Sequence, residues 1–405
     1  MVTRIDELEL PEVDLMGSVG EEAQAKLATA RAQHWLAKNV FLDTFGYSVT
    51  HYEDVVAILR DRRWHSAVAT MTDAMPEMNR PREQSILTME GPNHSRLRRL
   101  AAPAFTPKSA DRLRPFMRDV INGLVDKVAA AGRCELIEDV CEPYPIPIIC
   151  ELLGAPKQDW KLFSDWATDI FRIFNGEWEK DGPLIQAASE ALDSYVTDLI
   201  AQRRSTPGDD LLSDFIAAEE DGDRMSTSEL VMMTDAVLMA GTDTTRNQLA
   251  CSVALFTRHP DQWALLAERP ELATGAVEET MRMLGAVRGT ARVASEDIEY
   301  RGVLFPAGTL VGTSLGSANH DEDVFPDPFR FDITRVNEKP QMTFGSGIHF
   351  CMGANLARAE LQEALTILSR RMPNLATYDE IEWKAANIGI WGPAKLPLTF
   401  TPSAQ

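Results

Sequence analysis

The chain has 405 residues, of which 44% are hydrophobic and 25% are charged, so it is long enough to bury a large globular core. Its formal net charge of −21 disfavours a nucleic-acid partner, because such partners require a basic surface. The acidic N-terminus and the lack of an uninterrupted apolar run of membrane-spanning length predict neither a signal peptide nor a membrane anchor.

The five cysteines are odd in number and lack the spacing of a disulfide framework, which indicates a reducing compartment. We therefore expect a cytoplasmic protein. No repeat, low-complexity segment or long linker divides the chain, so we expect one monomeric domain over residues 1–405. Four cysteines lie among apolar neighbours and are interpreted as small core residues, namely Cys134, Cys141, Cys150 and Cys251.

The first part of the chain combines short regular elements with one long loop. Residues 40–50 are β-prone, and residues 52–60 have the pattern of a short helix. Residues 66–84 are rich in Met, Thr, Asn and Pro without periodicity, which predicts a loop. Loops of this length in a compact domain are usually functional.

A basic helix is predicted next, with Asn93 as its N-cap. His94 and Arg98 are four residues apart, so they share one helix face and can clamp an anion. Taken alone, this pattern fits a solvated basic face better. Residues 112–204 are mostly helical, and the aromatic side chains among them fit a substrate roof and a helix core equally well; they are Trp166, Phe171, Phe174 and Trp178.

Ser226-Thr-Ser-Glu229 is a capping box and predicts the start of a helix of roughly thirty residues, about 45 Å long. Proline stops helices, so this one is expected to end near His259-Pro260. Midway lies Ala240-Gly-Thr-Asp-Thr-Thr245, a poor helix sequence. A gap is expected there, with Thr hydroxyls bonded to backbone carbonyls; a tolerated kink is the alternative.

Glu279 and Arg282 are three residues apart in a helix predicted after Pro270, and alone they would be an ordinary ion pair. Alternating apolar residues then predict short strands over residues 287–313, and residues 381–400 are again β-like.

The most informative stretch is Phe344-Gly-Ser-Gly-Ile-His-Phe-Cys-Met-Gly353, which precedes a pattern of helical period. Its glycines allow tight turns that bring N–H groups near the sulfur of Cys351. The positive end of the following helix favours the thiolate over the thiol. No second Cys or His lies at zinc spacing, so this single thiolate suits the axial ligand of a haem. A buried structural cysteine is the alternative, which so long a pattern disfavours.

The run F-G-x-G-x-H-x-C-x-G-x-x-L-A resembles the haem-ligand loop of the cytochrome P450 family, and every defining position is filled. The stretch from Ala240 to Thr245 resembles that family's oxygen-activation motif. The resemblance implies a mainly α fold with a small β region, a single α-rich domain that encloses haem b. The expected lack of a membrane anchor points to the soluble bacterial type.

The resemblance also implies roles for individual residues. Asp243 and Thr244 would organise proton delivery. A Glu-Arg-Arg structural core on the thiolate side of the haem would comprise Glu279, Arg282 and Arg330. Family members usually have proline soon after the helical arginine, whereas this chain has Gly285-Ala286, so the path of the following strand is open. Residues expected at the haem are Cys351 as iron ligand, His94, Arg98, Arg292 and His349 at the propionates, and Phe344, Gly345 and Ala240.

The implied reaction is monooxygenation, in which one oxygen atom enters a C–H bond or an alkene. No flavin or iron–sulfur motif is present, so a separate ferredoxin and ferredoxin reductase are implied as electron donors. Arg96, Arg99 and Arg358 are expected to form the basic patch that binds the ferredoxin. The substrate is expected to be a hydrophobic small molecule. Its expected contacts are Val237, Met239, Ala240, Val287, Thr290, Ile390 and Trp391, with the loop around residues 71–78; Arg288 has no assigned role.

Two alternatives remain at this point. A peroxide-using haem enzyme of the same fold needs no redox partner, but it commonly lacks the acid–alcohol pair that Asp243 and Thr244 provide. A haem sensor or carrier would need no proton relay. Turnover with dioxygen and an electron donor distinguishes these functions.

Overall fold

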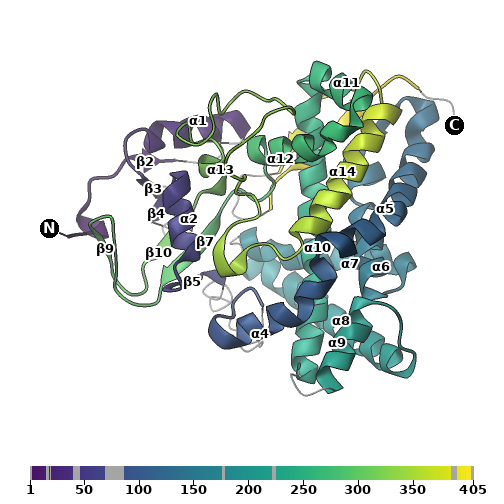
Figure 1. The fold of residues 1–405 in the computed structure, drawn as a ribbon, viewed down its shortest axis with the longest axis horizontal. Helices are drawn as coiled ribbons and strands as arrows, with labels where there is room; N and C mark the ends of the chain where they lie inside the picture. Colours follow the sequence, from purple (N-terminus) through teal and green to yellow (C-terminus); the bar gives the residue numbers. More distant parts are fainter. Residues whose placement is uncertain are drawn as a thin grey trace.

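The structure is a computed structural model, and it describes residues 2–14, 18, 20–39, 46–68, 86–175, 178–220, 225–384 and 390–402. Helices gather on one side, and short strands lie with the N-terminus on the other (Figure 1). The predicted mainly α fold with a small β region is confirmed. Across the described residues, none of the helices combines the length and apolar character that crossing a membrane requires.

The helical side is built around one long central helix, α10 (Thr227–Thr257). It begins at the predicted capping box, where Ser226 Oγ accepts from the N–H of Glu229 and Glu229 Oε2 accepts from the N–H of Ser226. The other helices are α1 (Gly20–Arg31), α2 (Tyr52–Arg60), α4 (Gly91–Ala101), α5 (Pro107–Val128), α6 (Pro145–Leu153), α7 (Trp160–Ile170), α8 (Trp178–Ser205), α9 (Leu211–Glu220), α11 (Pro260–Glu268), α12 (Ala273–Met283), α13 (Leu315–Ala318) and α14 (Ala354–Arg371).

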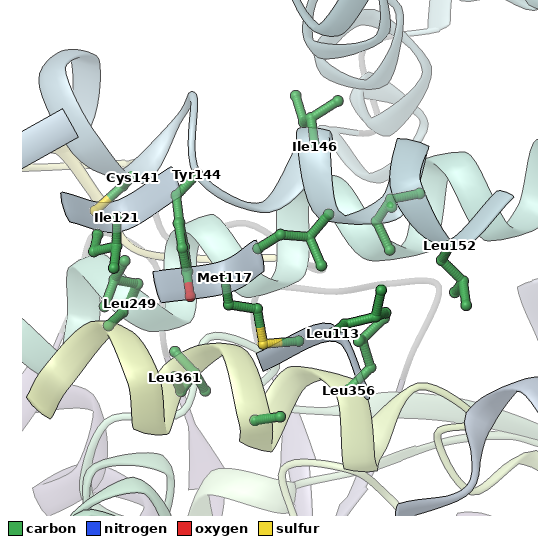
Figure 2. Close-up of a cluster of buried hydrophobic side chains, with 14 of the residues drawn as sticks. Leu113, Met117, Ile121, Cys141, Tyr144, Ile146, Leu152, Leu249, Leu356 and Leu361 are labelled. Carbon is green, nitrogen blue, oxygen red and sulfur yellow. The ribbon is translucent and has the colours of Figure 1, made fainter. Parts of the chain in front are cut away.

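The largest core lies where α5, α6, α10 and α14 meet. Figure 2 shows Met117 of α5 and Leu361 of α14 within this cluster of apolar side chains. Tyr144, which is fully buried, donates a hydrogen bond to the carbonyl oxygen of Glu360 at 2.9 Å, so its hydroxyl is satisfied within this core. This packing fixes α14, and the start of α14 carries the Cys351 loop.

The strands form small sheets, the largest of which has the order β2-β3-β4-β10-β7-β5. Within it, β7 (Thr290–Ala294) pairs antiparallel with both β10 (Leu310–Thr313) and β5 (Trp64–Ser66), which sets Arg292 opposite Val311 and Ser66. The remaining strands are β1 (Thr3–Arg4), β2 (Glu12–Val13), β3 (Leu36–Asn39), β4 (Tyr47–Val49), β6 (Arg133–Glu135), β8 (Ile298–Tyr300), β9 (Val303–Phe305), β11 (Ala376–Thr377), β12 (Glu382–Trp383), β13 (Pro393–Lys395) and β14 (Pro397–Thr399).

Two local predictions need correction. Helix α4 begins at Gly91 with Glu90 as its N-cap, and not after Asn93, because Pro92 is tolerated in the first turn of a helix. Helix α10 continues without interruption through residues 240–245, so no gap opens. The predicted Thr hydroxyl bonds are present, but they supplement the helical hydrogen bonds. Most of the predicted loop over residues 66–84, including residues 71–78, lies outside the described residues.

Among the aromatic side chains that fitted either a roof or a core, Trp166 lies edge-on to Phe163 and Tyr195, with centroids 5.8 Å apart in each case. Phe163 is fully buried, so this pair of contacts belongs to the core between α7 and α8. The side chains of Phe174 and Trp178 lie outside the described residues.

Candidate active site

The Cys351 loop is held in a fixed turn immediately before α14. Gly345 and Gly347 adopt φ values of 71° and 73°, which residues other than glycine rarely adopt. A Cβ at Gly347 would also collide with the carbonyl oxygen of Leu59 in α2. The N–H of Cys351 donates to the carbonyl oxygen of Phe344 at 3.0 Å and closes the loop on its first residue. The glycines of the Cys351 loop are therefore required by the positive φ values and by the close contact with α2.

Burial raises the pKa of the Cys351 thiol, while the N–H of Gly353 and the positive charges of Arg98 and Arg358 act in the opposite direction. A bound metal cation is the further positive charge that would hold this sulfur as a thiolate. Across the described residues, no group of three or more His, Cys, Asp or Glu side chains could hold a metal ion. The donor set is thus a single thiolate, as the axial site of a haem requires.

Three of the predicted propionate ligands, His94, Arg292 and His349, lie near Glu90, which the sequence analysis missed. His349 Nε2 lies 3.0 Å from Glu90 Oε1, and the rings of His94 and His349 are 4.5 Å apart. Burial alone would raise the pKa of Glu90, but hydrogen bonds from His349 and from the N–H of Ser66 outweigh it and lower that pKa. Nothing in the sequence around Glu90 signals this role.

Arg292 and His94 in this cluster have polar atoms that could still bind an anion. Arg292 is only 4% exposed, and no carboxylate among the described residues forms an ion pair with it. Among the described residues, its guanidinium donates to Thr290 Oγ1 (3.2 Å) and the carbonyl of Ala291 (2.9 Å). Burial lowers its pKa to about 10, and the more distant charge of Glu90 acts in the opposite direction. His94 is 1% exposed, and in the described part of the chain its Nε2 has no hydrogen-bond partner.

Arg98 is half-buried, and no carboxylate among the described residues forms an ion pair with it either. It donates to the carbonyl oxygen of Phe350 at 2.6 Å, and burial lowers its pKa. Buried cations without carboxylates are costly unless a ligand supplies the negative charge. Two guanidiniums and an orphaned imidazole nitrogen therefore fit the two carboxylates of haem b, which these residues would hold.

The motif in α10 presents a hydroxyl and a carboxylate in different directions. Thr244 Oγ1 donates to the carbonyl oxygen of Ala240 at 2.8 Å, and Ala240 is exposed although it lies in a helix that is otherwise largely buried. Asp243, 5% exposed, forms an ion pair with Arg246. A Cβ at Gly241 would collide with Ile149 of α6, so the glycine is explained by helix packing.

A second cation, Lys384, is linked to Asp243 through the side chain of Asn247. Asn247 Nδ2 donates to the carbonyl oxygen of Asp243 at 2.7 Å, and Lys384 Nζ donates to Asn247 Oδ1 at 2.8 Å. Burial lowers the pKa of Lys384, although the charge of Asp243 opposes the shift. The sequence analysis missed both Arg246 and Lys384. Arg246 follows Asp243 by three residues, and this spacing on a helix could have predicted the ion pair.

The predicted substrate contacts divide into two groups. Val287 and Ile390 form a β-bridge, and they are partly exposed, as is Thr290. Val237 shares the helix face of Ala240 and Thr244, because residues three or four apart on a helix are neighbours. These residues stay candidates.

Two other predicted substrate contacts are buried and stay predictions. Met239 is 8% exposed, much like Val237 at 6%, and it lies about 200° around α10 from Val237. Trp391 is 1% exposed, because it is stacked between Trp383, with centroids 4.6 Å apart, and the guanidinium of Arg288 at 4.4 Å. These contacts of Trp391 fix the position of the neighbouring residue Ile390.

The Gly285-Ala286 departure has a structural explanation. The N–H of Ala286 donates to Gln248 Oε1 at 2.9 Å, and its carbonyl accepts from the N–H of Trp391 at 2.8 Å. Proline at position 286 could not make the first of these bonds.

The Glu-Arg-Arg core is present, but with a different third member. Arg282 donates from Nε and Nη2 to Glu279 at 2.8 and 2.9 Å, and both side chains are at most 2% exposed. Arg335 Nε completes the group at 3.2 Å from Glu279 Oε1. The prediction of Arg330 is wrong, because its side chain is 69% exposed and pairs with Asp332. Only its carbonyl oxygen takes part, accepting from Arg282 and Arg335.

The predicted ferredoxin patch also needs correction. Arg96 is paired with Glu229, and Arg358 is paired with Glu278; both arginines are half-buried. Arg99 is exposed. Arg60, which the prediction omitted, is exposed too and donates to Ser346 Oγ of the Cys351 loop at 3.0 Å.

These features define a protein that holds a haem through a single cysteine thiolate, and the comparisons with known proteins agree. The family model for cytochrome P450 matches residues 149–371. Nocardicin C N-oxygenase of Nocardia uniformis subsp. tsuyamanensis is 39% identical, over 87% of this chain and 89% of that protein. Mycinamicin IV hydroxylase/epoxidase of Micromonospora griseorubida is 38% identical, with the same coverage of 87% and 89%.

A solved structure gives the same result for the fold. The complex of P450BioI with an acyl carrier protein that carries hexadec-9Z-enoic acid matches with a TM-score of 0.84 and 33% identity, over 93% of this chain and 98% of that chain. The chain belongs to the cytochrome P450 family, and it is a P450 monooxygenase with a haem–thiolate cofactor.

Proposed function

We propose that this P450 hydroxylates or epoxidises a hydrophobic small molecule, with electrons from a ferredoxin and its reductase. The observation that supports it best is the mainly apolar set beside the acid–alcohol pair: Val237 and Ala240 on one face of α10, and the bridged Val287 and Ile390. Relatives named as a hydroxylase/epoxidase and as a vitamin D(3) 25-hydroxylase act in this way on other molecules.

In this proposal the haem supplies the iron that activates dioxygen, and the chain holds it and delivers protons. Cys351 is the iron ligand. His94, Arg98, Arg292 and His349 would hold the propionates, and Phe344, Gly345 and Ala240 would contribute to holding the haem. The charges of buried Arg292 and half-buried Arg98 are then balanced by the ligand, which explains why no carboxylate of the described residues forms an ion pair with them.

Thr244 and Asp243 have distinct tasks in proton delivery. The Thr244 hydroxyl donates a hydrogen bond to the carbonyl of Ala240, so its lone pairs are available to accept one from a water molecule or another O–H group beside this turn. Asp243 is the acid that exchanges protons with solvent, and its ion pair with Arg246 holds the carboxyl group in place.

The electron donor is proposed to bind where the Cys351 loop reaches the surface. Arg60 and Arg99 are exposed there or nearby, and Phe350, next to Cys351, is 40% exposed. Two cations beside an exposed aromatic ring suit a small acidic ferredoxin. We further infer one monomeric domain over residues 1–405, because α2 of the strand-rich side contacts the Cys351 loop at Gly347. The free cysteines suit the reducing cytoplasm.

The test begins with the purified holoprotein. Fatty acids, terpenoids, steroids and macrolides are screened for a low-to-high spin shift of the haem, and each hit is incubated with dioxygen, ferredoxin, its reductase and NADPH. The proposal predicts a product heavier by one oxygen atom, labelled from ¹⁸O₂. Product formation only with hydrogen peroxide would instead support the peroxide-using enzyme, and a spin shift without any product would support a sensor or carrier.

A further inference from the structure

Arg358 does not lie on an open surface; it joins three parts of the thiolate side. It lies in the second turn of α14, seven residues after Cys351. Its guanidinium carbon is 4.5 Å from the ring centroid of Phe344, the first residue of the Cys351 loop. Because Phe344 accepts the hydrogen bond from the N–H of Cys351, a contact on Phe344 bears directly on the sulfur-carrying residue.

The same guanidinium is held by a carboxylate of α12. Arg358 donates from Nε to Glu278 Oε1 at 2.5 Å and from Nη2 to Glu278 Oε2 at 3.1 Å. Each side chain is 27% exposed, so water screens this pair only in part. Gln341 Nε2 also donates to Glu278 Oε2, at 3.3 Å. The bidentate geometry fixes the plane of the guanidinium over the Phe344 ring.

We propose that Arg358 and Glu278 form a positioning pair that fixes Phe344 and sets how strongly the Cys351 sulfur donates to the haem iron. This inference rests on the proposed role of Cys351 as iron ligand. Arg358 acts in two ways: its stack keeps the loop closed, and its positive charge withdraws electron density from the sulfur. Glu278 orients Arg358 and offsets part of that charge.

The two members of the pair have opposite electrostatic effects, which makes the proposal testable. A positive charge near the sulfur stabilises the electron-richer reduced state, so its removal in Arg358→Gln lowers the midpoint potential. Removal of the negative charge in Glu278→Gln raises it. The expected change in the equilibrium constant of one-electron reduction is roughly three- to tenfold in each direction, at about 59 mV per tenfold.

Arg358→Lys separates charge from geometry. It keeps the positive charge but loses the planar, bidentate contact and the stack on Phe344. The potential of this variant should stay near that of the wild type. Its reduced carbon monoxide complex should lose the thiolate-type, red-shifted Soret band several-fold faster, because the loop is less firmly closed.

The experiment is a redox titration of the substrate-free holoprotein with chemical mediators, so that no ferredoxin takes part. Arg371→Gln is the matched control: Arg371 pairs with Asp126 at 2.7 Å at the other end of the same helix, and its loss should leave the potential unchanged. Shifts of opposite sign in the Gln variants support the proposal. Unchanged potentials, or shifts of the same sign in both, overturn it.

A failure of this inference can be told apart from a failure of the proposed function. If Cys351→Ser keeps the red-shifted Soret band, Cys351 is not the ligand and both fail together. If Cys351→Ser loses that band while Arg358→Gln and Glu278→Gln titrate as the wild type, only the positioning pair is wrong.

Discussion

The two sides of the candidate haem site differ in how their cations are balanced. On the thiolate side, Glu279 binds Arg282 and Arg335, and Glu278 binds Arg358. At the propionate cluster, buried Arg292 and half-buried Arg98 donate to carbonyl groups, and no carboxylate of the described residues forms an ion pair with them. Cations paired within the protein stabilise its fold, whereas buried cations without such partners are suited to bind an anionic ligand.

The Asp243–Arg246 pair belongs to neither group. The pair is buried, yet it lies in the turn of α10 that also carries Thr244, and the carboxyl group of Asp243 is the proposed proton relay. A buried ion pair therefore indicates a purely structural role only when it does not lie next to the reaction site. The predictions below test each side of this comparison.

Glu279→Gln should give the largest loss of stability. It leaves Arg282 and Arg335 buried without a carboxylate, at a cost of about 3–5 kcal/mol in the free energy of unfolding. Urea denaturation of the purified protein measures this cost. The control is Glu382→Gln, which removes an exposed pair with Lys395 and should cost less than about 1 kcal/mol. Equal losses in the two variants would contradict a structural role for Glu279.

Arg292→Gln should have the opposite pattern. Haem binding should weaken by about 1.5–3 kcal/mol, because a charged hydrogen bond to a propionate is lost. The haem-free protein should be as stable as the wild type or more so, since an unbalanced buried cation is removed. Haem transfer to apomyoglobin measures the dissociation rate. A wild-type rate, or a large loss of stability in the haem-free form, would assign Arg292 to the fold.

Asp243→Asn should slow turnover about tenfold or more, which corresponds to at least about 1.4 kcal/mol in activation free energy. Thr244→Ala should still consume NADPH but release hydrogen peroxide in place of product. Steady-state measurements of NADPH, peroxide and product, made with a substrate found by spin shift, distinguish these effects. Wild-type rate and coupling in both variants would exclude the relay.

The smallest expected effect is a pH dependence from His94. Burial lowers its pKa to about 4 in the haem-free protein, with the charges of His349 and Arg98 acting in the same direction. The unfolded state, with a pKa near 6.5, then binds more protons, so stability falls as the pH drops from about 6.5 towards 4. Nearby propionates would raise the pKa of His94 and flatten this dependence in the holoprotein. His94→Gln should remove the difference between the two forms.

Sequence reasoning worked best where a motif is local. The capping box at Ser226, the extent of α10 and the turn of the Cys351 loop follow from residues within a few positions of one another. The family resemblance supplied the other candidate residues of the site, among them Arg292 and Thr244, whose roles stay predictions.

Errors arose where a role depends on tertiary contacts. Arg330 and Arg335 lie in the same segment, and only the structure shows that the side chain of Arg335 is the one that contacts Glu279. Arg358 was expected to be a surface cation because its partner Glu278 is 80 residues away in the sequence. Glu90 carries no local signal at all, because its role depends on His349, 259 residues later.

The central claim is that Cys351 supplies the single thiolate to the haem. The direct measurement is the absorption spectrum of the reduced carbon monoxide complex of Cys351→Ser beside the wild type, after haem content has been matched. The account predicts a red-shifted, thiolate-type Soret band in the wild type and its loss in the variant. A red-shifted band that persists in Cys351→Ser would contradict it.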